Sequence, residues 1–248
     1  MGRREYKYIV SSDRLEALRA MILPHVDRDQ HAATQPGGEY TVRSLYLDTL
    51  RLKFYHDKIA GLQKRMKLRI RGYNDITECS PVYLEIKRKD GSSVTKNRSA
   101  LQAKDVLRSF DGGDIGELLL FDTNPEMSLE NAKKFFYQVH TLGLHPVICV
   151  DYEREPYFSR IDCGVRLTLD KNLRVRRAVT PSALTMNVPT VGVLPGRFVF
   201  EVKTDSRIPL WIQMILSRLD AVREAVSKYT LGVESLAIAD VPLKMWRA

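Results

Sequence analysis

The sequence predicts an α+β protein built on an eight-stranded antiparallel β tunnel, a closed barrel with a charged interior that α-helices surround. Eight segments alternate apolar and polar residues with the period of two that is typical of a β-strand. Their polar positions are mostly charged: in Arg65-Met66-Lys67-Leu68-Arg69-Ile70-Arg71, every odd position is cationic and every even one apolar. Helices would cover the apolar face and leave the charged face to line the interior.

The elements can be placed along the chain from these patterns. Strands are expected at 4–10, 40–48, 65–73, 82–90, 92–99, 146–155, 164–170 and 197–204. Helices are expected where apolar residues recur three or four positions apart. These segments are 12–23, 49–61, 102–110, 114–121, 128–141, 208–219 and 221–230. The expected loops are 27–39 and 180–196, which contain proline and glycine.

Length and composition restrict the class of protein. The 248 residues are 44% hydrophobic, which is enough for a sizeable core, and we expect a single domain over 1–248. The net charge of +9 favours an anionic partner. Cys79, Cys149 and Cys163 are too few and too scattered for a disulfide framework or a paired-cysteine zinc site, so a reducing cytoplasm is the predicted location.

A glutamate precedes a lysine by two positions in three of the expected strands. The pairs are Glu5 and Lys7, Glu85 and Lys87, and Glu201 and Lys203. The spacing places both charges of each pair on one face of its strand. One such strand is typical of an antiparallel sheet with a solvated face, but the recurrence on several strands favours a shared charged surface.

This surface would carry a large excess of positive charge. Its cations would be Lys7, Lys67, Arg69, Arg71, Lys87, Lys96, Arg98, Arg154, Arg166 and Lys203, and its anions Glu5, Glu85 and Glu201. Crowded like charges repel each other, and a bound polyanion would relieve that repulsion. Because the guanidinium fork matches phosphate oxygens, the surface predicts a phosphate-rich ligand.

The three glutamates allow two interpretations. Carboxylates among phosphate-binding cations can hold Mg²⁺ or Mn²⁺ against phosphate oxygens. They can also be salt-bridge partners of the neighbouring lysines. Both interpretations stay open for Glu5 and Glu85, and for Glu201 the metal is favoured.

Nine short motifs, in order along nearly the whole chain, resemble the VTC-type polyphosphate polymerase domain, a branch of the CYTH or triphosphate tunnel metalloenzyme superfamily. They are Glu5-Tyr6-Lys7-Tyr8, Ser44-Leu45-Tyr46-Leu47-Asp48-Thr49, Lys67-Leu68-Arg69-Ile70-Arg71-Gly72-Tyr73, Leu84-Glu85-Ile86-Lys87, Lys96-Asn97-Arg98, Asp151-Tyr152-Glu153-Arg154, Val165-Arg166-Leu167-Thr168-Leu169-Asp170, Phe200-Glu201-Val202-Lys203 and Ser227-Lys228-Tyr229.

The resemblance implies an eight-stranded antiparallel tunnel and a reaction. Such domains transfer the γ-phosphoryl group of ATP to a growing inorganic polyphosphate chain and release ADP, with Mn²⁺ or Mg²⁺ in the tunnel. By this similarity the phosphate-gripping catalytic residues are Lys7, Arg69, Arg71, Lys87, Arg154, Arg166 and Lys228. Further phosphate contacts are expected from Lys67, Lys96, Arg98, Lys203 and Ser227, and the metal ligands are expected to be Glu201, Glu85 and Glu5.

One departure and three alternatives bear on this interpretation. Triphosphatases of the superfamily have an N-terminal Glu-x-Glu-x-Lys motif, whereas Arg3 stands two residues before Glu5 here, which favours transfer to phosphate over transfer to water. A triphosphatase, a non-catalytic binder of polyphosphate or nucleotide, and a nucleic-acid binder remain as alternatives. Nucleic acid is not an expected partner, because the cations alternate with core residues on separate strands. The sequence carries no signal for or against a membrane-protein partner.

Overall fold

The computed structural model describes residues 4–91, 93–120, 123–162 and 164–239. Arg3 and Cys163, which entered the sequence analysis, lie outside this part of the chain. The chain divides into two compact units. The first unit comprises Met1–Thr41, Tyr152–Leu173 and Gly192–Ser227, and the second comprises Val42–Asp151, Arg174–Val191 and Lys228–Ala248. The single domain expected over 1–248 stays a prediction.

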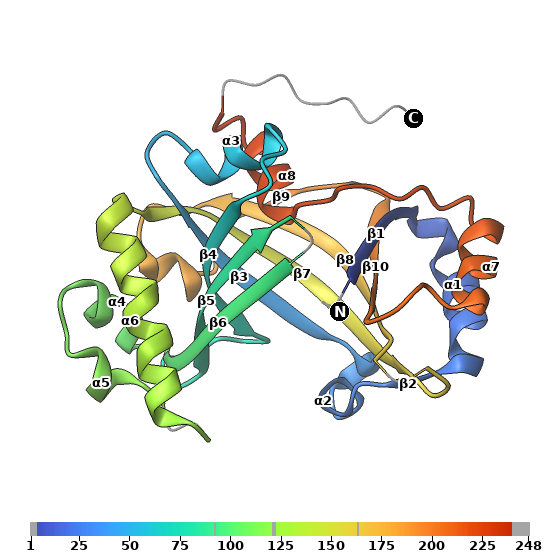
Figure 1. Ribbon diagram of the computed structural model, residues 1–248, viewed down its shortest axis with the longest axis horizontal. Helices are drawn as coiled ribbons and strands as arrows, with labels where there is room; N and C mark the ends of the chain where they lie inside the picture. Colours follow the sequence, from blue (N-terminus) through green and yellow to red (C-terminus); the bar gives the residue numbers. More distant parts are fainter. Residues whose placement is uncertain (1–3, 92, 121–122, 163, 240–248) are drawn as a thin grey trace. The chain divides into compact units, whose positions relative to one another are not determined.

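Strands and helices share the chain in the order that Figure 1 shows. The strands are β1 (Arg4–Ser11), β2 (Val26–Arg28), β3 (Tyr40–Asp48), β4 (Arg65–Tyr73), β5 (Pro81–Asp90), β6 (Ser93–Gln102), β7 (His145–Ser159), β8 (Arg166–Arg177), β9 (Val191–Gly192) and β10 (Arg197–Thr204). The α-helices are α1 (Leu15–Ile22), α2 (Gln30–Ala33), α3 (Lys53–Ile59), α4 (Asp105–Phe110), α5 (Ile115–Leu118), α6 (Pro125–Leu142), α7 (Leu210–Arg218) and α8 (Lys228–Ser235). Short 3-10 helices are η1 (Ser12–Arg14), η2 (Leu23–His25), η3 (Pro36–Gly38) and η4 (Pro181–Leu184).

The eight predicted strands are all present, but the prediction of a closed eight-stranded barrel is wrong. Two short strands, β2 and β9, lie at the start of one expected loop and within the other, which makes a ten-stranded sheet. The strand order is β1-β10-β8-β7-β3-β4-β5-β6, with β2 on β7 and β9 on β8. Within the described residues this path has two ends, β1 and β6, so the sheet is not closed. Alternation identifies the apolar face of each strand and carries no information on which edges pair.

All seven predicted helical segments contain helical residues, but the prediction for 221–230 is wrong over most of its length. Residues 221–227 are not helical, and α8 begins only at Lys228. Arg223 instead forms an antiparallel bridge with Tyr8 of β1, and the Glu224 amide donates to the Lys7 carbonyl at 2.9 Å. The open edge of β1 thus supplies the backbone partners that a helix would otherwise provide.

In the first unit, helices cover the apolar face of the strands. The core is formed by strand residues such as Phe200 and Leu167, with Leu18 of α1 and Ile212 of α7 packed against them. Figure 1 shows both helices beside β1 and β10. Each such side chain stabilises the fold by about 1.5–3 kcal/mol through burial. The charged residues of the alternating pattern are consequently left on the other face.

The second unit repeats this division between an apolar and a charged face. Leu68 and Ile70 of β4 and Ile86 of β5 are buried against Phe135 of α6 and Phe54 of α3. Helix α6 begins at a cap in which the Asn124 side chain accepts from the Met127 amide at 3.0 Å. It ends at Gly143, which has a φ of 59°. The prediction that helices cover the apolar side of the strands is therefore confirmed in both units.

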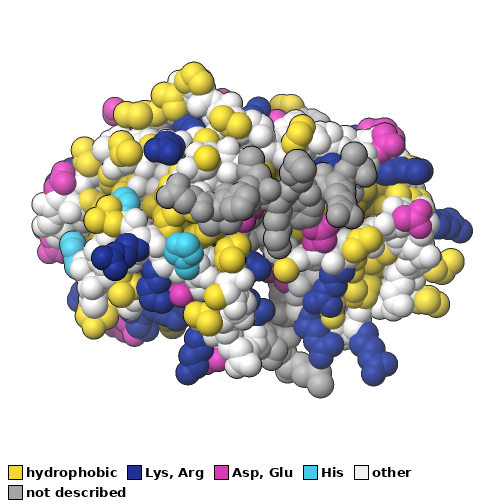
Figure 2. Space-filling model, turned by 90° about the horizontal axis from the view of Figure 1, so that it is seen from above, with side chains coloured by type: hydrophobic (Ala, Val, Ile, Leu, Met, Phe, Trp, Pro, Cys, Tyr) yellow, Lys and Arg dark blue, Asp and Glu magenta, His cyan; other side chains and the backbone are white. Residues whose placement is uncertain are grey.

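The surface carries the basic excess that the composition requires. Lysine and arginine number 39 against 30 acidic residues. Figure 2 shows basic side chains at many places on one face, interspersed with apolar and acidic ones. Among the described helices, none is both long and apolar enough to cross a bilayer.

Candidate functional site

Strand register brings charged residues of the first unit together on one face. Lys7 of β1 lies opposite Glu201 of β10, and Glu201 lies opposite Thr168 of β8. One step along, Lys203 is the register partner of both Glu5 and Arg166. Directly opposite residues in an antiparallel pair have neighbouring side chains, so these residues interact across three strands.

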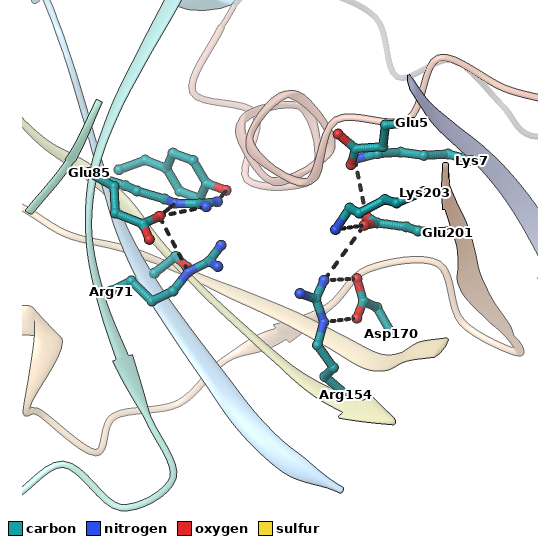
Figure 3. A network of polar contacts seen from close by, with 11 residues as sticks. Glu5, Lys7, Arg71, Glu85, Arg154, Asp170, Glu201 and Lys203 are labelled. Carbon is teal, nitrogen blue, oxygen red and sulfur yellow. Dashed lines mark hydrogen bonds and ion pairs between the residues drawn. The ribbon is translucent and has the colours of Figure 1, made fainter. Parts of the chain in front are cut away.

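Glu201 is the centre of this group, although only 3% of its side chain is exposed. Its Oε1 lies 3.1 Å from Lys7 Nζ, and its Oε2 lies 3.3 Å from Lys203 Nζ and 3.7 Å from Arg154 Nη2. Figure 3 shows these contacts. We call Glu5, Lys7, Arg154, Asp170, Glu201 and Lys203 the Glu201 cluster. A buried carboxylate with three cations is stabilised in its ionised form.

Arg154 is held by a second carboxylate in the same cluster. Its Nε and Nη2 donate to the two carboxylate oxygens of Asp170 at 2.6 and 2.7 Å, the bidentate geometry that arginine prefers. Burial alone would lower the pKa of Arg154, but Asp170, Tyr152 and Glu201 raise it well above its usual range. The guanidinium is therefore fixed in position and permanently charged.

Lys7 connects the two glutamates of the first unit. Its Nζ lies 3.3 Å from Glu5 Oε1 and 3.1 Å from Glu201 Oε1, so an ammonium group bridges both carboxylates. Burial lowers the pKa of Lys203 to about 8, and Glu201 only partly opposes this. The Glu201 cluster thus holds a cation between two carboxylates, with further positive charge around them.

The second unit contains a group built around Glu85 of β5. Register places Arg69 of β4 and Arg98 of β6 directly opposite Glu85, on either side. Arg69 Nε donates to Glu85 Oε2 at 2.7 Å, and Arg71 Nε lies 3.8 Å from the same oxygen. Lys96 Nζ and Arg98 Nε lie 2.5 and 3.5 Å from Glu85 Oε1. We call Arg69, Arg71, Glu85, Lys96 and Arg98 the Glu85 cluster, of which Figure 3 labels Arg71 and Glu85.

One buried carboxylate organises four cations in the Glu85 cluster. Burial would raise the pKa of Glu85, but Arg69, Arg71 and Lys96 together hold it far below its usual 4.5. Burial also lowers the pKa of Lys96, and Glu85 partly offsets this. One carboxylate neutralises only one of the four positive charges. The cluster can therefore bind a polyanion while Glu85 stays paired with its cationic neighbours.

The structure places the remaining predicted residues on strands β4, β5 and β8 and at the start of α8. Lys67, Lys87 and Lys96 form one register row of the second unit. Arg166 of the first unit lies 3.4 Å from Asp29 and over the ring of Phe158. Ser227 and Lys228 are buried, and the charge of Lys228 contributes to a lowered pKa of Tyr46 in the second unit.

Several polar residues of these sites were missed by sequence reasoning. Asp170 accepts a hydrogen bond from Arg154 Nε, and Ser44 Oγ lies 3.3 Å from Arg71 Nε. Tyr46 accepts a hydrogen bond from Arg69, and Asp48 accepts one from Tyr229. Asp170 could have been found, because it shares the alternating face of Arg166 and Thr168. The tyrosines gave no such signal, since aromatic residues in strands are usually core residues.

The carboxylates differ in how well they fit a divalent metal. Across the described ranges, no group of three or more His, Cys, Asp or Glu side chains could hold a metal by itself. Glu5 and Glu201 share one cation, so this pair suits a metal that takes its other ligands from phosphate and water. Glu85 fits less well, because it has no second carboxylate beside it in its cluster and contacts four cationic side chains.

Comparison with known proteins identifies the class. The VTC domain family matches residues 2–237, and the chain belongs to this family. It is similar to vacuolar transporter chaperone complex subunit 4 of Trypanosoma brucei brucei, with 27% identity over 203 residues that cover 70% of this chain and 26% of the relative. The same subunit of Trypanosoma cruzi is 26% identical over 279 residues, covering 94% of this chain and 34% of the relative. The chain thus spans about a third or less of these curated relatives.

A solved structure shares the fold at lower sequence identity. It is described as a putative adenylyl cyclase from Hippeastrum with a dominant triphosphatase activity. The TM-score is 0.52 at 15% identity, and the alignment covers 98% of this chain and 99% of the other. At this identity the likeness concerns the fold. The same arrangement of strands and helices is therefore shared by proteins with different sequences.

Proposed function

We propose that the protein is a polyphosphate polymerase, which transfers the γ-phosphoryl group of ATP to the end of an inorganic polyphosphate chain and releases ADP. The observation that carries this proposal is the pair of cation-rich clusters on the strands of a VTC domain. The VTC family match and the similarity to subunit 4 of the vacuolar transporter chaperone complex support this proposal.

The residues of each cluster would bind phosphate oxygens. In the first unit these are Lys7, Arg154 and Lys203, with Arg166 beside them. In the second unit, Arg69, Arg71, Lys96 and Arg98 lie around Glu85. We assign supporting phosphate contacts to Lys67, Lys87, Ser227 and Lys228. Fixed cations lower the barrier to phosphoryl transfer by aligning the phosphates and neutralising their charge.

The carboxylates divide between two roles in this proposal. Glu5 and Glu201 would hold Mn²⁺ or Mg²⁺, and the metal supplies charge neutralisation on the phosphate oxygens when it is bound. Lys7, which bridges these carboxylates, would then turn its ammonium group to a phosphate. Glu85 instead holds Arg69 and Lys96 in place, and its predicted role as a metal ligand stays a prediction.

The proposed reaction requires little acid–base chemistry. The acceptor is the terminal oxygen of polyphosphate, which is already anionic and needs no proton removed. Both clusters are accordingly made of charged arginines, lysines and carboxylates. Hydrolysis would need a water activated by a base; in this proposal Glu5 and Glu201 are assigned to the metal, and Asp170 is held by Arg154.

The test is incubation of purified protein with ATP, Mn²⁺ and a short polyphosphate primer. Long chains on a gel, in step with ADP release, are the expected result. Free phosphate with ADP and no chains would identify a triphosphatase instead. Tight polyphosphate binding without turnover would identify a binding module. Cytoplasmic location and assembly with a membrane-protein partner stay predictions, to be tested by localisation and co-purification.

A further inference from the structure

Tyr46 of β3 belongs to the charged face of the second unit and has no role in the functions considered so far. It lies directly opposite Arg69 in the register of β3 and β4. Arg69 Nη1 donates to the Tyr46 hydroxyl oxygen at 3.1 Å, and the guanidinium carbon lies 5.8 Å from the Tyr46 ring centroid. Tyr46 is 5% exposed, so bulk water supplies few alternative partners.

The hydroxyl proton of Tyr46 is left for a ligand. A guanidinium can only donate, so the contact with Arg69 uses a lone pair of the phenol and leaves its O–H available. The charged groups that affect the pKa of Tyr46 most are Arg69, Arg71 and Lys228, all of them cations. Within the part of the chain that the structure describes, no acceptor is found for this proton. A buried donor surrounded by cations matches an anionic acceptor.

A second tyrosine and an aspartate hold the ring of Tyr46 in place. The Tyr229 ring of α8 stacks on it, with 5.1 Å between centroids and 30° between planes. The Tyr229 hydroxyl donates to Asp48 Oδ2 at 2.6 Å. Asp48 is fully buried and also accepts from the Thr49 amide and from the Phe54 and Tyr55 amides in the first turn of α3. The ring is therefore fixed by two helices and by its own strand.

We propose that the Tyr46 hydroxyl donates a hydrogen bond to a phosphate oxygen of the bound triphosphate or polyphosphate, with Tyr229 and Asp48 as positioning residues. This inference rests on the proposed function, because it takes the Glu85 cluster to be a phosphate site. It adds to that site a neutral donor that fixes the orientation of one phosphate group, whereas the surrounding cations attract any polyanion.

The acidity of the phenol agrees with this role. Burial would raise the pKa of Tyr46 above its usual 10, but Arg69, Arg71 and Lys228 lower it below that value. A more acidic hydroxyl is a stronger donor to phosphate oxygen. Tyr229 shows the opposite behaviour, because burial and the neighbouring Asp48 raise its pKa and keep its proton on the hydrogen bond to Asp48.

The test is calorimetric titration of sodium tripolyphosphate into the wild type and into Tyr46→Phe, which removes the hydroxyl and keeps the stacked ring. Loss of a hydrogen bond to a charged acceptor should weaken binding roughly 10- to 100-fold. Tyr55→Phe is the matched control: it removes another buried hydroxyl of the second unit, 3.4 Å from Glu234 of α8, and should leave binding unchanged. Thermal melting of both variants verifies the fold.

A second comparison separates direct contact from an effect through Arg69. Tyr46→Phe is introduced into the Arg69→Ala variant, in which the Tyr46 hydroxyl no longer accepts a hydrogen bond from Arg69. A further loss of affinity in the double variant supports direct contact with phosphate. If the second substitution changes nothing, or if Tyr46→Phe alone binds as the wild type does, the inference is overturned. Absence of tripolyphosphate binding to the wild type would overturn the proposed function as well.

Discussion

The two clusters start from the same Glu-x-Lys strand pattern and differ in how they use the glutamate. In the first unit, Glu201 shares Lys7 with a second carboxylate, Glu5, and Arg154 has its own partner in Asp170. In the second unit, Glu85 alone faces four cations. The number of carboxylates per cation therefore separates a group that suits a metal from a group that suits phosphate alone.

The difference arises from the neighbouring strands. Residues opposite Glu201 are Lys7 and Thr168, whereas those opposite Glu85 are Arg69 and Arg98. Glu85 therefore has an arginine directly opposite it on both neighbouring strands, whereas Glu201 has a directly opposite cation on β1 only. The same local motif thus acquires different chemistry from its sheet partners.

The sharpest test of this comparison is metal dependence. Glu201→Gln should abolish polymerisation at every Mn²⁺ concentration, because the pair of metal-binding carboxylates is lost. Glu85→Gln should keep the Mn²⁺ midpoint of the wild type and show a raised KM for ATP, because only the arginines lose their anchor. ADP release is measured across a Mn²⁺ titration. An unchanged midpoint in an active Glu201→Gln variant would remove Glu201 from the metal site.

The next largest effect is expected on phosphate binding in the second unit. Arg69→Ala should lower kcat/KM by roughly 10²- to 10³-fold, the range for loss of one donor to a transition-state oxygen. The fold should persist, since Glu85 keeps Arg71, Lys96 and Arg98 as partners. Circular dichroism and thermal melting are measured beside the kinetics. If the Arg69→Ala protein were unfolded, Arg69 would be needed for folding, and this would contradict the proposal that the excess cations of the Glu85 cluster serve phosphate binding.

The two clusters should also differ in how much their carboxylates contribute to the free energy of unfolding. Asp170→Ala leaves the buried Arg154 without its bidentate partner, and the free energy of unfolding should fall by about 3–5 kcal/mol. Glu85→Ala should cost less, because Lys96 and Arg98 have side chains that are 44% and 40% exposed and can be hydrated. Denaturant unfolding of both variants measures the difference. Equal losses would show that the two clusters are equally structural.

The smallest change is expected in acid stability, to which Glu155 of the first unit and Glu85 of the second contribute. Burial would raise the pKa of Glu155 in the first unit, but hydrogen bonds from Arg19 and Lys171 lower it from 4.5 to about 2. Since the folded pKa lies below the unfolded one, the unfolded state binds the proton first as pH falls. This stabilisation is complete above pH 4.5 and is lost between 4.5 and about 2.

The measurement is the urea midpoint between pH 6 and pH 3 for the wild type, Glu155→Gln and Glu85→Gln. The fall of the urea midpoint with decreasing pH should be smaller in Glu155→Gln than in the wild type. It should also be smaller in Glu85→Gln, because the pKa of Glu85 is lowered as well. A wild-type midpoint that stays constant over this range would contradict the lowered pKa of both carboxylates.

The strands were predictable because alternation directly records a half-buried sheet. The charged runs around Arg69 and Glu85 on β4 and β5 could be assigned to one face from the alternation alone. The segment 221–230 was mispredicted, because its helical pattern competes with the open edge of β1, where Tyr8 pairs with Arg223. A backbone partner distant in sequence decided that local structure.

The amino-acid sequence alone specifies which residues face the core, which residues carry the excess of positive charge, and the resemblance to a VTC domain. Three pairings depend instead on how the strands and helices come together: Asp170 neutralises Arg154, Lys7 joins Glu5 to Glu201, and Tyr46 lies beside Arg69. The face of a strand follows from a period of two within one segment, whereas these partners follow from the register between segments distant in sequence.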